Sequence, residues 1–141
     1  MESADARLVR SGLLILCLTA TVFCGKSPAG PSTPLNERFT LAPSETMTIR
    51  DANVRIQFIE VTGDSRCPAD VVCIQAGDAI VRIRVSDIGD GAAYELHTGD
   101  SSRAAVTYSQ LRIALVDLQP YPVSSRPIAA GDYRATLIVT R

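Results

Sequence analysis

Hydrophobic and polar residues alternate along most of the chain from residue 37 to the C-terminus. In the clearest run, residues 79–86, hydrophobic residues at 79, 81, 83 and 85 are separated by arginines at 82 and 84. A repeat of two residues is typical of a β-strand that buries one face. Runs of the same kind predict further strands at residues 38–41, 46–50, 54–61, 94–97, 106–108, 111–118 and 133–139.

Two of these runs change phase part of the way along. The adjacent Phe58 and Ile59 shift the hydrophobic positions within residues 54–61, which indicates a β-bulge. Val116 and Leu118 are out of phase with the start of their run in the same way.

The spacing of the runs defines the fold class. After Cys24, no stretch of eleven or more residues has the periodicity of a helix. About eight short strands, separated by turns such as Gly89-Asp90-Gly91, are typical of an all-β domain. We therefore predict that residues 37–141 form a single antiparallel β-sandwich, immunoglobulin-like or small-barrel-like. Three aromatic residues are expected to point into its core: Phe39, Phe58 and Tyr133.

The first 23 residues have the organisation of an export signal. Arg7 and Arg10 precede an uncharged run of twelve residues, Gly12–Phe23. This length suits the core of a signal peptide, about 7–15 residues, whereas a membrane-spanning helix needs roughly 20. We therefore predict a signal peptide at residues 1–23, and a short membrane anchor that is not cleaved is the alternative.

The segment that follows predicts a lipid anchor. Thr21–Cys24 resembles the lipobox of bacterial lipoproteins, in which the cysteine is lipidated and becomes the mature N-terminus. Phe23 is larger than the residue usual before that cysteine, so cleavage after Ala20 and secretion in soluble form is the alternative. Residues 24–36 include three prolines and two glycines without apolar periodicity, which is typical of an extended tether. We predict a domain attached to a membrane of the cell envelope through Cys24.

Charge and composition exclude several classes of protein. Fourteen basic and fifteen acidic residues give a net charge of −1, and the two signs are interspersed. Because nucleic-acid binding depends on a basic surface, we expect no nucleic-acid partner. Hydrophobic residues at 46% and charged residues at 21% are ordinary for a globular domain. No glycine-rich loop leads from a strand into a helix, and no cofactor is expected.

Cys67 and Cys73 lie six positions apart in residues 62–78, between two of the predicted strands. In an exported protein, such a pair is expected to form a disulfide. A structural zinc site needs four cysteine or histidine ligands, and the mature domain offers only these two cysteines and His97. We therefore expect no metal-binding role for the cysteines.

Four charged residues around the cysteines are candidates for binding. Asp64, Asp70 and Asp78 are expected in an Asx-turn, a turn and a strand start, respectively. A weak calcium site is the first alternative for these acids, and the paired carboxylates of a carbohydrate-active hydrolase are the second. Arg66 is expected either to pair with Asp64 or Asp78 as a structural clamp, or to present its guanidinium group to an anionic ligand.

The sequence offers little for catalysis. A nucleophile needs an adjacent base, usually histidine, and His97 is the single histidine of the chain. It ends a predicted strand beside a turn, and we expect it to face outward into solvent. No Gly-x-Ser-x-Gly elbow surrounds Ser65, Ser101 or Ser102. We therefore predict no catalytic residues and no enzymatic activity.

The cysteine segment carries a resemblance to a known group. Asp64-Ser65-Arg66-Cys67-Pro68, followed by Cys73 and Ala76-Gly77-Asp78-Ala79, resembles a group of uncharacterised bacterial exported proteins and lipoproteins. Their Pro-Tyr-Pro and Asp-Tyr elements match Pro120-Tyr121-Pro122 and Asp132-Tyr133. That group usually has tryptophan where this chain has Gln75. The resemblance supports export and the cysteine loop, and it implies no activity.

These observations predict a non-catalytic binding or structural module of the cell envelope. Loops on a rigid β scaffold are the usual place for recognition, and the longest predicted loops are residues 62–78 and 119–131. The second holds Tyr121 and Arg126 among prolines, so ordering it on binding costs little entropy. Protection of a sheet edge by those prolines is the structural alternative. The expected partner is an envelope protein or glycan, and a protease inhibitor that presents both loops to an active-site cleft is the functional alternative.

Overall fold

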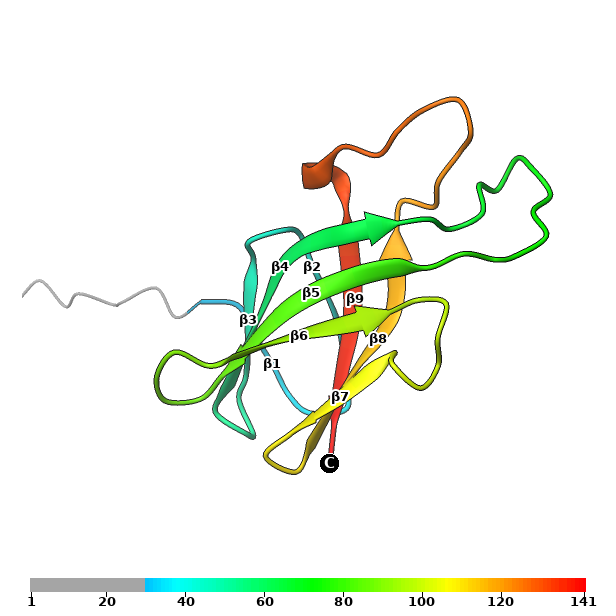
Figure 1. Ribbon diagram of the computed structural model, residues 1–141. Helices are drawn as coiled ribbons and strands as arrows, with labels where there is room; N and C mark the ends of the chain where they lie inside the picture. Colours follow the sequence, from blue (N-terminus) through cyan, green and yellow to red (C-terminus); the bar gives the residue numbers. More distant parts are fainter. Residues whose placement is uncertain (1–29) are drawn as a thin grey trace, which may run out of the picture.

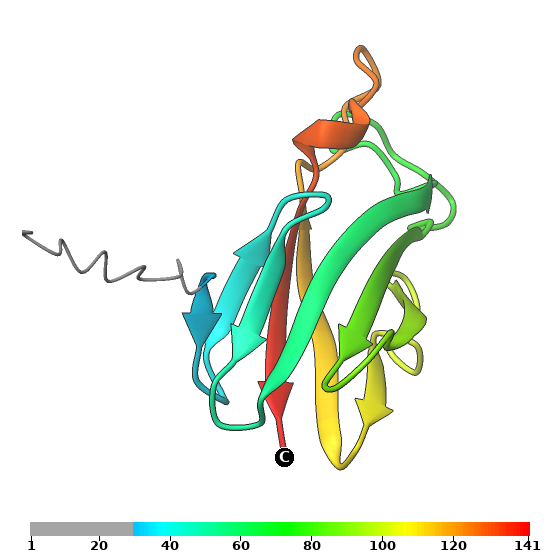
Figure 2. The same cartoon turned by 90° about the vertical axis from the view of Figure 1, so that its left-hand side faces the viewer.

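The computed structural model describes residues 30–141, which form two β-sheets that face each other (Figures 1 and 2). The five-stranded sheet has the order β1-β3-β4-β5-β6, and the four-stranded sheet has the order β2-β9-β8-β7. The first sheet contains Ser32–Thr33 (β1), Thr46–Ile49 (β3), Val54–Asp64 (β4), Ala79–Ser86 (β5) and Ala92–His97 (β6). The second contains Arg38–Leu41 (β2), Ala105–Tyr108 (β7), Leu111–Gln119 (β8) and Arg134–Thr140 (β9), and a short 3-10 helix, Ala130–Asp132 (η1), precedes β9. The all-β sandwich predicted from the sequence is confirmed.

The core lies between the two sheets and follows the alternating pattern of the sequence. In β5, Ala79, Val81, Ile83 and Val85 are all fully buried. The three aromatic residues expected to point inward are buried as well: Phe39, Phe58 and Tyr133. Since burial of one such side chain stabilises a domain by about 1.5–3 kcal/mol, this shared core holds the sheets together.

Both phase changes in the sequence correspond to irregular strand pairing. In β4, the register with β5 shifts between Phe58 and Glu60, and again between Val61 and Gly63. In β8, the register with β9 shifts between Leu115 and Asp117. A β-bulge places one extra residue in one strand of the pair. The residues after it therefore alternate one position later than those before it, which explains why the hydrophobic positions change phase at these places.

The structure adds one strand that the sequence assigns to the tether. Ser32 and Thr33 pair in parallel with Thr48 and Ile49 of β3, and Thr33 is buried. Two residues are too few to show a period of two, so this strand leaves no trace in the sequence pattern. Cys24, Ala20 and the rest of residues 1–29 lie outside the described part of the chain. Among residues 30–141, no helix is long and apolar enough to cross a membrane.

Three loops gather at one end of the sandwich, which we call the loop end (Figure 1). They are residues 65–78 between β4 and β5, residues 98–104 between β6 and β7, and residues 120–133 between β8 and β9. The hairpin at residues 87–91 joins β5 to β6 at the opposite end. The two long loops singled out in the sequence are therefore neighbours in space.

Candidate functional site

Arg66 ties the two sheets together at the loop end. Its side chain is 5% exposed, and its Nε and Nη2 donate to the two carboxylate oxygens of Asp64 at 2.9 and 2.6 Å. Nη1 donates to the carbonyl oxygen of Leu118 at 2.6 Å, and Nη2 donates to that of Pro120 at 3.0 Å. Four of the five N–H donors of the guanidinium group are thus used within residues 30–141. Of the two roles expected for Arg66, the structure shows the clamp, with Asp64 as its partner.

Asp64 is the acceptor at the centre of this clamp. It also accepts the Tyr133 hydroxyl at 3.1 Å and the backbone N–H of Arg66 at 3.2 Å, which is the Asx-turn expected from the sequence. Burial by itself would raise the pKa of Asp64, but the hydrogen bonds and the positive charge of Arg66 hold this pKa below its usual value. The Asp64 carboxyl is therefore ionised at neutral pH.

The cysteine loop is closed at its base. Cys67 and Cys73 form a disulfide with an S–S distance of 2.13 Å. The backbone N–H of Cys67 donates to the carbonyl oxygen of Ala76 at 2.8 Å, and that of Ser65 donates to Asp78 at 2.7 Å. Gly77 has a φ of 72°, and a Cβ at this position would lie 1.8 Å from the carbonyl oxygen of Ser65. The base of the loop therefore requires glycine at residue 77.

The two candidate binding loops are joined to each other. The backbone N–H of Ala69 donates to the carbonyl oxygen of Pro122 at 2.9 Å. Asp70 accepts the backbone N–H of Ser124 at 2.8 Å and its hydroxyl at 2.5 Å. The guanidinium carbon of Arg66 lies 5.2 Å from the centre of the Tyr121 ring. These contacts join the cysteine loop and the 120–133 loop into one structural unit, although the contacting residues Asp70 and Ser124 are more than 50 positions apart in the sequence.

Tyr121 and Arg126 lie at different parts of this unit. Tyr121 is half-exposed over the clamp. Arg126 is exposed and lines an open groove of about 570 Å³ together with Pro68 and Ser124. Tyr121 and Arg126, the binding candidates of the second loop, are therefore accessible, while the guanidinium group of Arg66 is largely used inside the protein.

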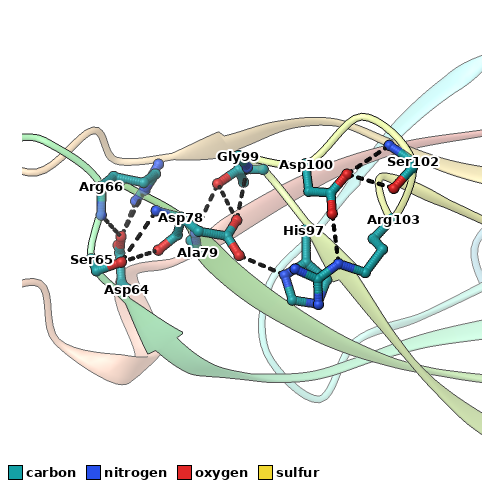
Figure 3. A network of polar contacts seen from close by, with 11 residues as sticks. Asp64, Ser65, Arg66, Asp78, Ala79, His97, Gly99, Asp100, Ser102 and Arg103 are labelled. Carbon is teal, nitrogen blue, oxygen red and sulfur yellow. Dashed lines mark hydrogen bonds and ion pairs between the residues drawn. The ribbon is translucent and has the colours of Figure 1, made fainter. Parts of the chain in front are cut away.

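Asp78 organises a second polar network at the loop end (Figure 3). One carboxylate oxygen lies 2.5 Å from Nδ1 of His97, and the other accepts the backbone N–H of Gly99 at 2.7 Å and the hydroxyl of Thr98 at 3.3 Å. Burial would raise the pKa of Asp78, but the hydrogen bond from His97 and those from Gly99 and Thr98 lower it. The carboxyl is held ionised, directly before the first residue of β5.

The expectation for His97 is wrong. The residue is only 6% exposed, although the alternation along its strand places it on the outward face. The 98–104 loop turns back beside the end of β6, where the backbone N–H of His97 donates to the carbonyl oxygen of Arg103 at 3.0 Å. Alternation predicts exposure only for an open face, and here a loop and the Asp78 carboxylate cover it.

The most exposed hydrophobic side chains of the loop end were not identified in the sequence. Val72 and Ile74 flank Cys73 with relative exposures of 102% and 105%, and Val71 is partly exposed. We call Val71, Val72 and Ile74 the apolar tip; it lies on the loop that projects beyond the sheets (Figure 1). A signal existed in the sequence, since three hydrophobic residues occur in a loop where no strand period explains them.

The three acids around the cysteine loop have separate partners. Asp64 binds Arg66, Asp70 binds Ser124, and Asp78 binds His97 and Gly99. Within the described chain, no three His, Cys, Asp or Glu side chains are grouped so that they could hold a metal ion. Each carboxylate thus fixes a different part of the loop end.

Comparison with known proteins gives no match: no family model, no curated protein and no solved structure is similar to this chain. The loop end therefore consists of two loops that are bonded to each other, an apolar tip on one of them, and two polar networks, centred on Asp64 and Asp78.

Proposed function

We propose that the protein is a non-catalytic binding module of the cell envelope whose recognition surface is the apolar tip together with Tyr121. One observation carries this proposal: Val72 and Ile74 are completely exposed on a loop that is fixed in place. Exposed hydrophobic side chains gathered at one site are typical of interaction surfaces. Burial of each against a partner would contribute about 1.5–3 kcal/mol to binding.

The fixed shape of the loop supports the same proposal. The disulfide, the Arg66 clamp and the bonds between Asp70 and Ser124 restrain the loop that bears the tip. A loop that is already ordered loses little conformational entropy on binding, so less of the favourable contact free energy is offset and the affinity is higher. The partner that fits a projecting apolar tip is a protein with an apolar depression.

The location at the envelope is supported by the N-terminal sequence. The signal-like residues 1–23 and the lipobox-like Thr21–Cys24 favour a lipoprotein whose domain is held at a membrane. Residues 25–31, which precede β1 and include two prolines and two glycines, suit the connection between anchor and domain.

The test is chemical cross-linking of the protein in native envelopes, followed by identification of the proteins attached to it. The double variant Val72→Asp, Ile74→Asp places charge on the tip and is expected to lose the partners recovered with the wild type. Ile88→Asp is the matched control, because Ile88 is 92% exposed but lies on the hairpin at the opposite end. Equal recovery from the tip variant and the wild type would contradict the proposal.

A protease inhibitor is the second candidate function, and the apolar tip favours it. A projecting, pre-ordered loop closed by a disulfide suits the concave active-site cleft of a protease, and such complexes form with little backbone movement. This candidate predicts stoichiometric inhibition of a serine or cysteine protease by the wild type, and its loss in the tip variant. Inhibition that persists in the tip variant would exclude the tip as the inhibitory loop.

A further inference from the structure

The outer face of the five-stranded sheet carries three exposed arginines on its two central strands: Arg55 of β4, and Arg82 and Arg84 of β5 (Figure 1). Arg82 has acids on both sides, since its Nη1 lies 3.6 Å from Oε1 of Glu60 and it is opposite Glu95 of β6. None of the ion pairs formed within residues 30–141 includes Arg55 or Arg84. The uncompensated positive charge of this face is therefore found at these two positions.

The strand register brings Arg55 and Arg84 to the same place on the sheet. Arg55 is opposite Ser86, and Gln57 is opposite Arg84, so the two arginines are diagonal neighbours on adjacent strands. Diagonal neighbours on one face are roughly 7–8 Å apart, which is within reach of long side chains. Both arginines can therefore contact one ligand that lies between them.

A hollow of about 150 Å³ lies at this place. The residues that line it are Thr46, Arg55, Gln57, Arg84 and Ser86. Each of these five side chains has at least one hydrogen-bond donor, the two arginines have no acceptor, and none of the five is an acid. The lining therefore favours a ligand that accepts hydrogen bonds and carries negative charge.

The acids next to the lining residues in the sequence, Glu45 and Asp87, do not change this balance. Glu45 accepts the backbone N–H of Ala42 at 2.8 Å, and Asp87 accepts the hydroxyl of Tyr108 at 3.0 Å. Neither carboxylate belongs to the lining of the hollow. A cationic ligand would thus meet two like charges there and no acid to balance them.

Size and charge together indicate the class of anion. Pockets for drug-sized ligands measure about 300–1,000 Å³, so this hollow suits a single anionic group. A carboxylate has one negative charge and two oxygens, which one guanidinium group can satisfy by two parallel hydrogen bonds. A phosphate monoester has a charge of about −1.5 to −2 and three acceptor oxygens. Two arginines with hydroxyl groups beside them match the phosphate monoester better.

We propose that this hollow binds a phosphate monoester group between the guanidinium groups of Arg55 and Arg84. Such a group occurs on small soluble molecules and on the headgroups of some lipids, and the hollow presents the same chemistry to both. This site goes beyond the proposed function. It lies beside the end of β5 from which the 87–91 hairpin leaves, and it includes neither the apolar tip nor Tyr121.

The test follows the Nε–H signals of arginine side chains by nitrogen-15 NMR, in the full chain with Cys24→Ser so that no lipid is attached. Glycerol 3-phosphate is added at low ionic strength, because salt screens exposed charges, and at about pH 7.5, where the monoester is mostly doubly charged. We expect saturable shifts of the Arg55 and Arg84 signals, with one Kd in the millimolar range, and no such shift of Arg112, which is exposed on the other sheet. No saturable shift, an equal shift of Arg112, or equal affinity for acetate would overturn the proposal.

Variants separate a site from general electrostatic attraction. Arg84→Gln is expected to weaken the binding of glycerol 3-phosphate about tenfold, which corresponds to 1.4 kcal/mol. Arg84→Lys should weaken it less, because lysine keeps the charge but not the planar fork of donors. Arg112→Gln is the matched control, which removes the same charge from the other sheet and should leave the Kd unchanged. Equal losses from Arg84→Gln and Arg112→Gln would overturn the proposal.

The double variant of the apolar tip, Val72→Asp with Ile74→Asp, is expected to bind glycerol 3-phosphate like the wild type. A failure of the tip as a protein-binding surface therefore does not affect this test.

A second arm distinguishes the two sources of the phosphate group. The same chain is floated with vesicles of phosphatidylcholine, with and without phosphatidic acid, whose headgroup is a phosphate monoester. Recovery that requires phosphatidic acid and is reduced by Arg84→Gln but not by Arg112→Gln would assign a lipid headgroup. Shifts with glycerol 3-phosphate without this recovery would assign a soluble ligand. Both results support the phosphate site, and the shifts with glycerol 3-phosphate are required in either case.

Discussion

Arg66 shows how much of the loop end depends on one side chain. Its guanidinium group spans from Asp64, at the end of one sheet, to the carbonyl oxygens of Leu118 in the other sheet and of Pro120 in the loop that follows β8. Removal of one member of a buried ion pair leaves the other charge without compensation. The carbonyl oxygens would lose their donors at the same time.

Replacement of this residue is therefore expected to be costly. Arg66→Met should lower the free energy of unfolding by about 3–5 kcal/mol, measured by urea denaturation. Arg126→Met is the matched control, an exposed arginine of the same loop end, and should change stability by about 0.5 kcal/mol or less. Comparable losses from the two variants would show that the clamp does not stabilise the fold.

Asp64 of the clamp and Asp78 of the second network contribute to how the protein responds to acid. The pKa values of Asp64 and Asp78 are lower in the folded protein than the ordinary value. The unfolded chain therefore binds protons more readily than the folded protein at low pH. The stability that the two ionised carboxyls contribute is fully present above the pKa of an aspartate in the unfolded chain, about 3.9, and is lost as the pH falls toward their lower pKa values in the folded protein. We expect the urea midpoint to fall between pH 5 and pH 3.

A double variant tests whether these two carboxyls are responsible. Asp64→Asn with Asp78→Asn should be less stable than the wild type at pH 7 but should lose less stability on acidification. An unchanged pH dependence in this variant would assign the effect to other groups.

The extent to which single residues could be predicted from the sequence depends on how local their partners are. The Asx-turn of Asp64 was predictable because its partner, Arg66, is two positions away. The carbonyl oxygens that complete the clamp are 52 and 54 residues away, and no local pattern indicates them. His97 was misplaced because the groups that cover it, the 98–104 loop and the Asp78 carboxylate, lie outside its own strand, and alternation within the strand does not indicate them.

At the scale of elements, strands with repeated alternation were predictable and the shortest strand was not. Each strand of four or more residues has a corresponding run in the sequence, and both bulged strands show a change of phase. The sequence also predicts the cysteine pairing, because two nearby cysteines in an exported chain have few other roles. The parallel pairing of Ser32–Thr33 needed the structure.

The cysteine loop is expected to respond to reduction as a local element. Replacement of both Cys67 and Cys73 by serine should cost roughly 2 kcal/mol, since the disulfide closes a short loop. Amide hydrogen exchange should rise within residues 65–78 while β4 and β5 stay protected, because their ladders do not involve the cysteines. Loss of protection throughout the sandwich would show that the disulfide supports the whole fold.

At the scale of the whole molecule, the first prediction concerns whether the protein is attached to a membrane. Cys24→Ser removes the thiol that would carry lipid in the predicted lipobox, and we expect it to move the protein from the membrane fraction to the soluble fraction. Fractionation followed by mass spectrometry of the mature N-terminus is the measurement. A wild-type protein that is soluble and begins directly after Ala20 would replace the lipoprotein interpretation with ordinary secretion.

The direction of β9 has a practical consequence for the study of this protein. The strand begins beside η1 at the loop end and runs the length of the sandwich, so Arg141 emerges at the opposite pole (Figures 1 and 2). A fluorophore or affinity handle attached after Arg141 would therefore stand about seven strand residues, roughly 23 Å, from the loops. A molecule immobilised on a sensor through this position would have the apolar tip turned toward the solution.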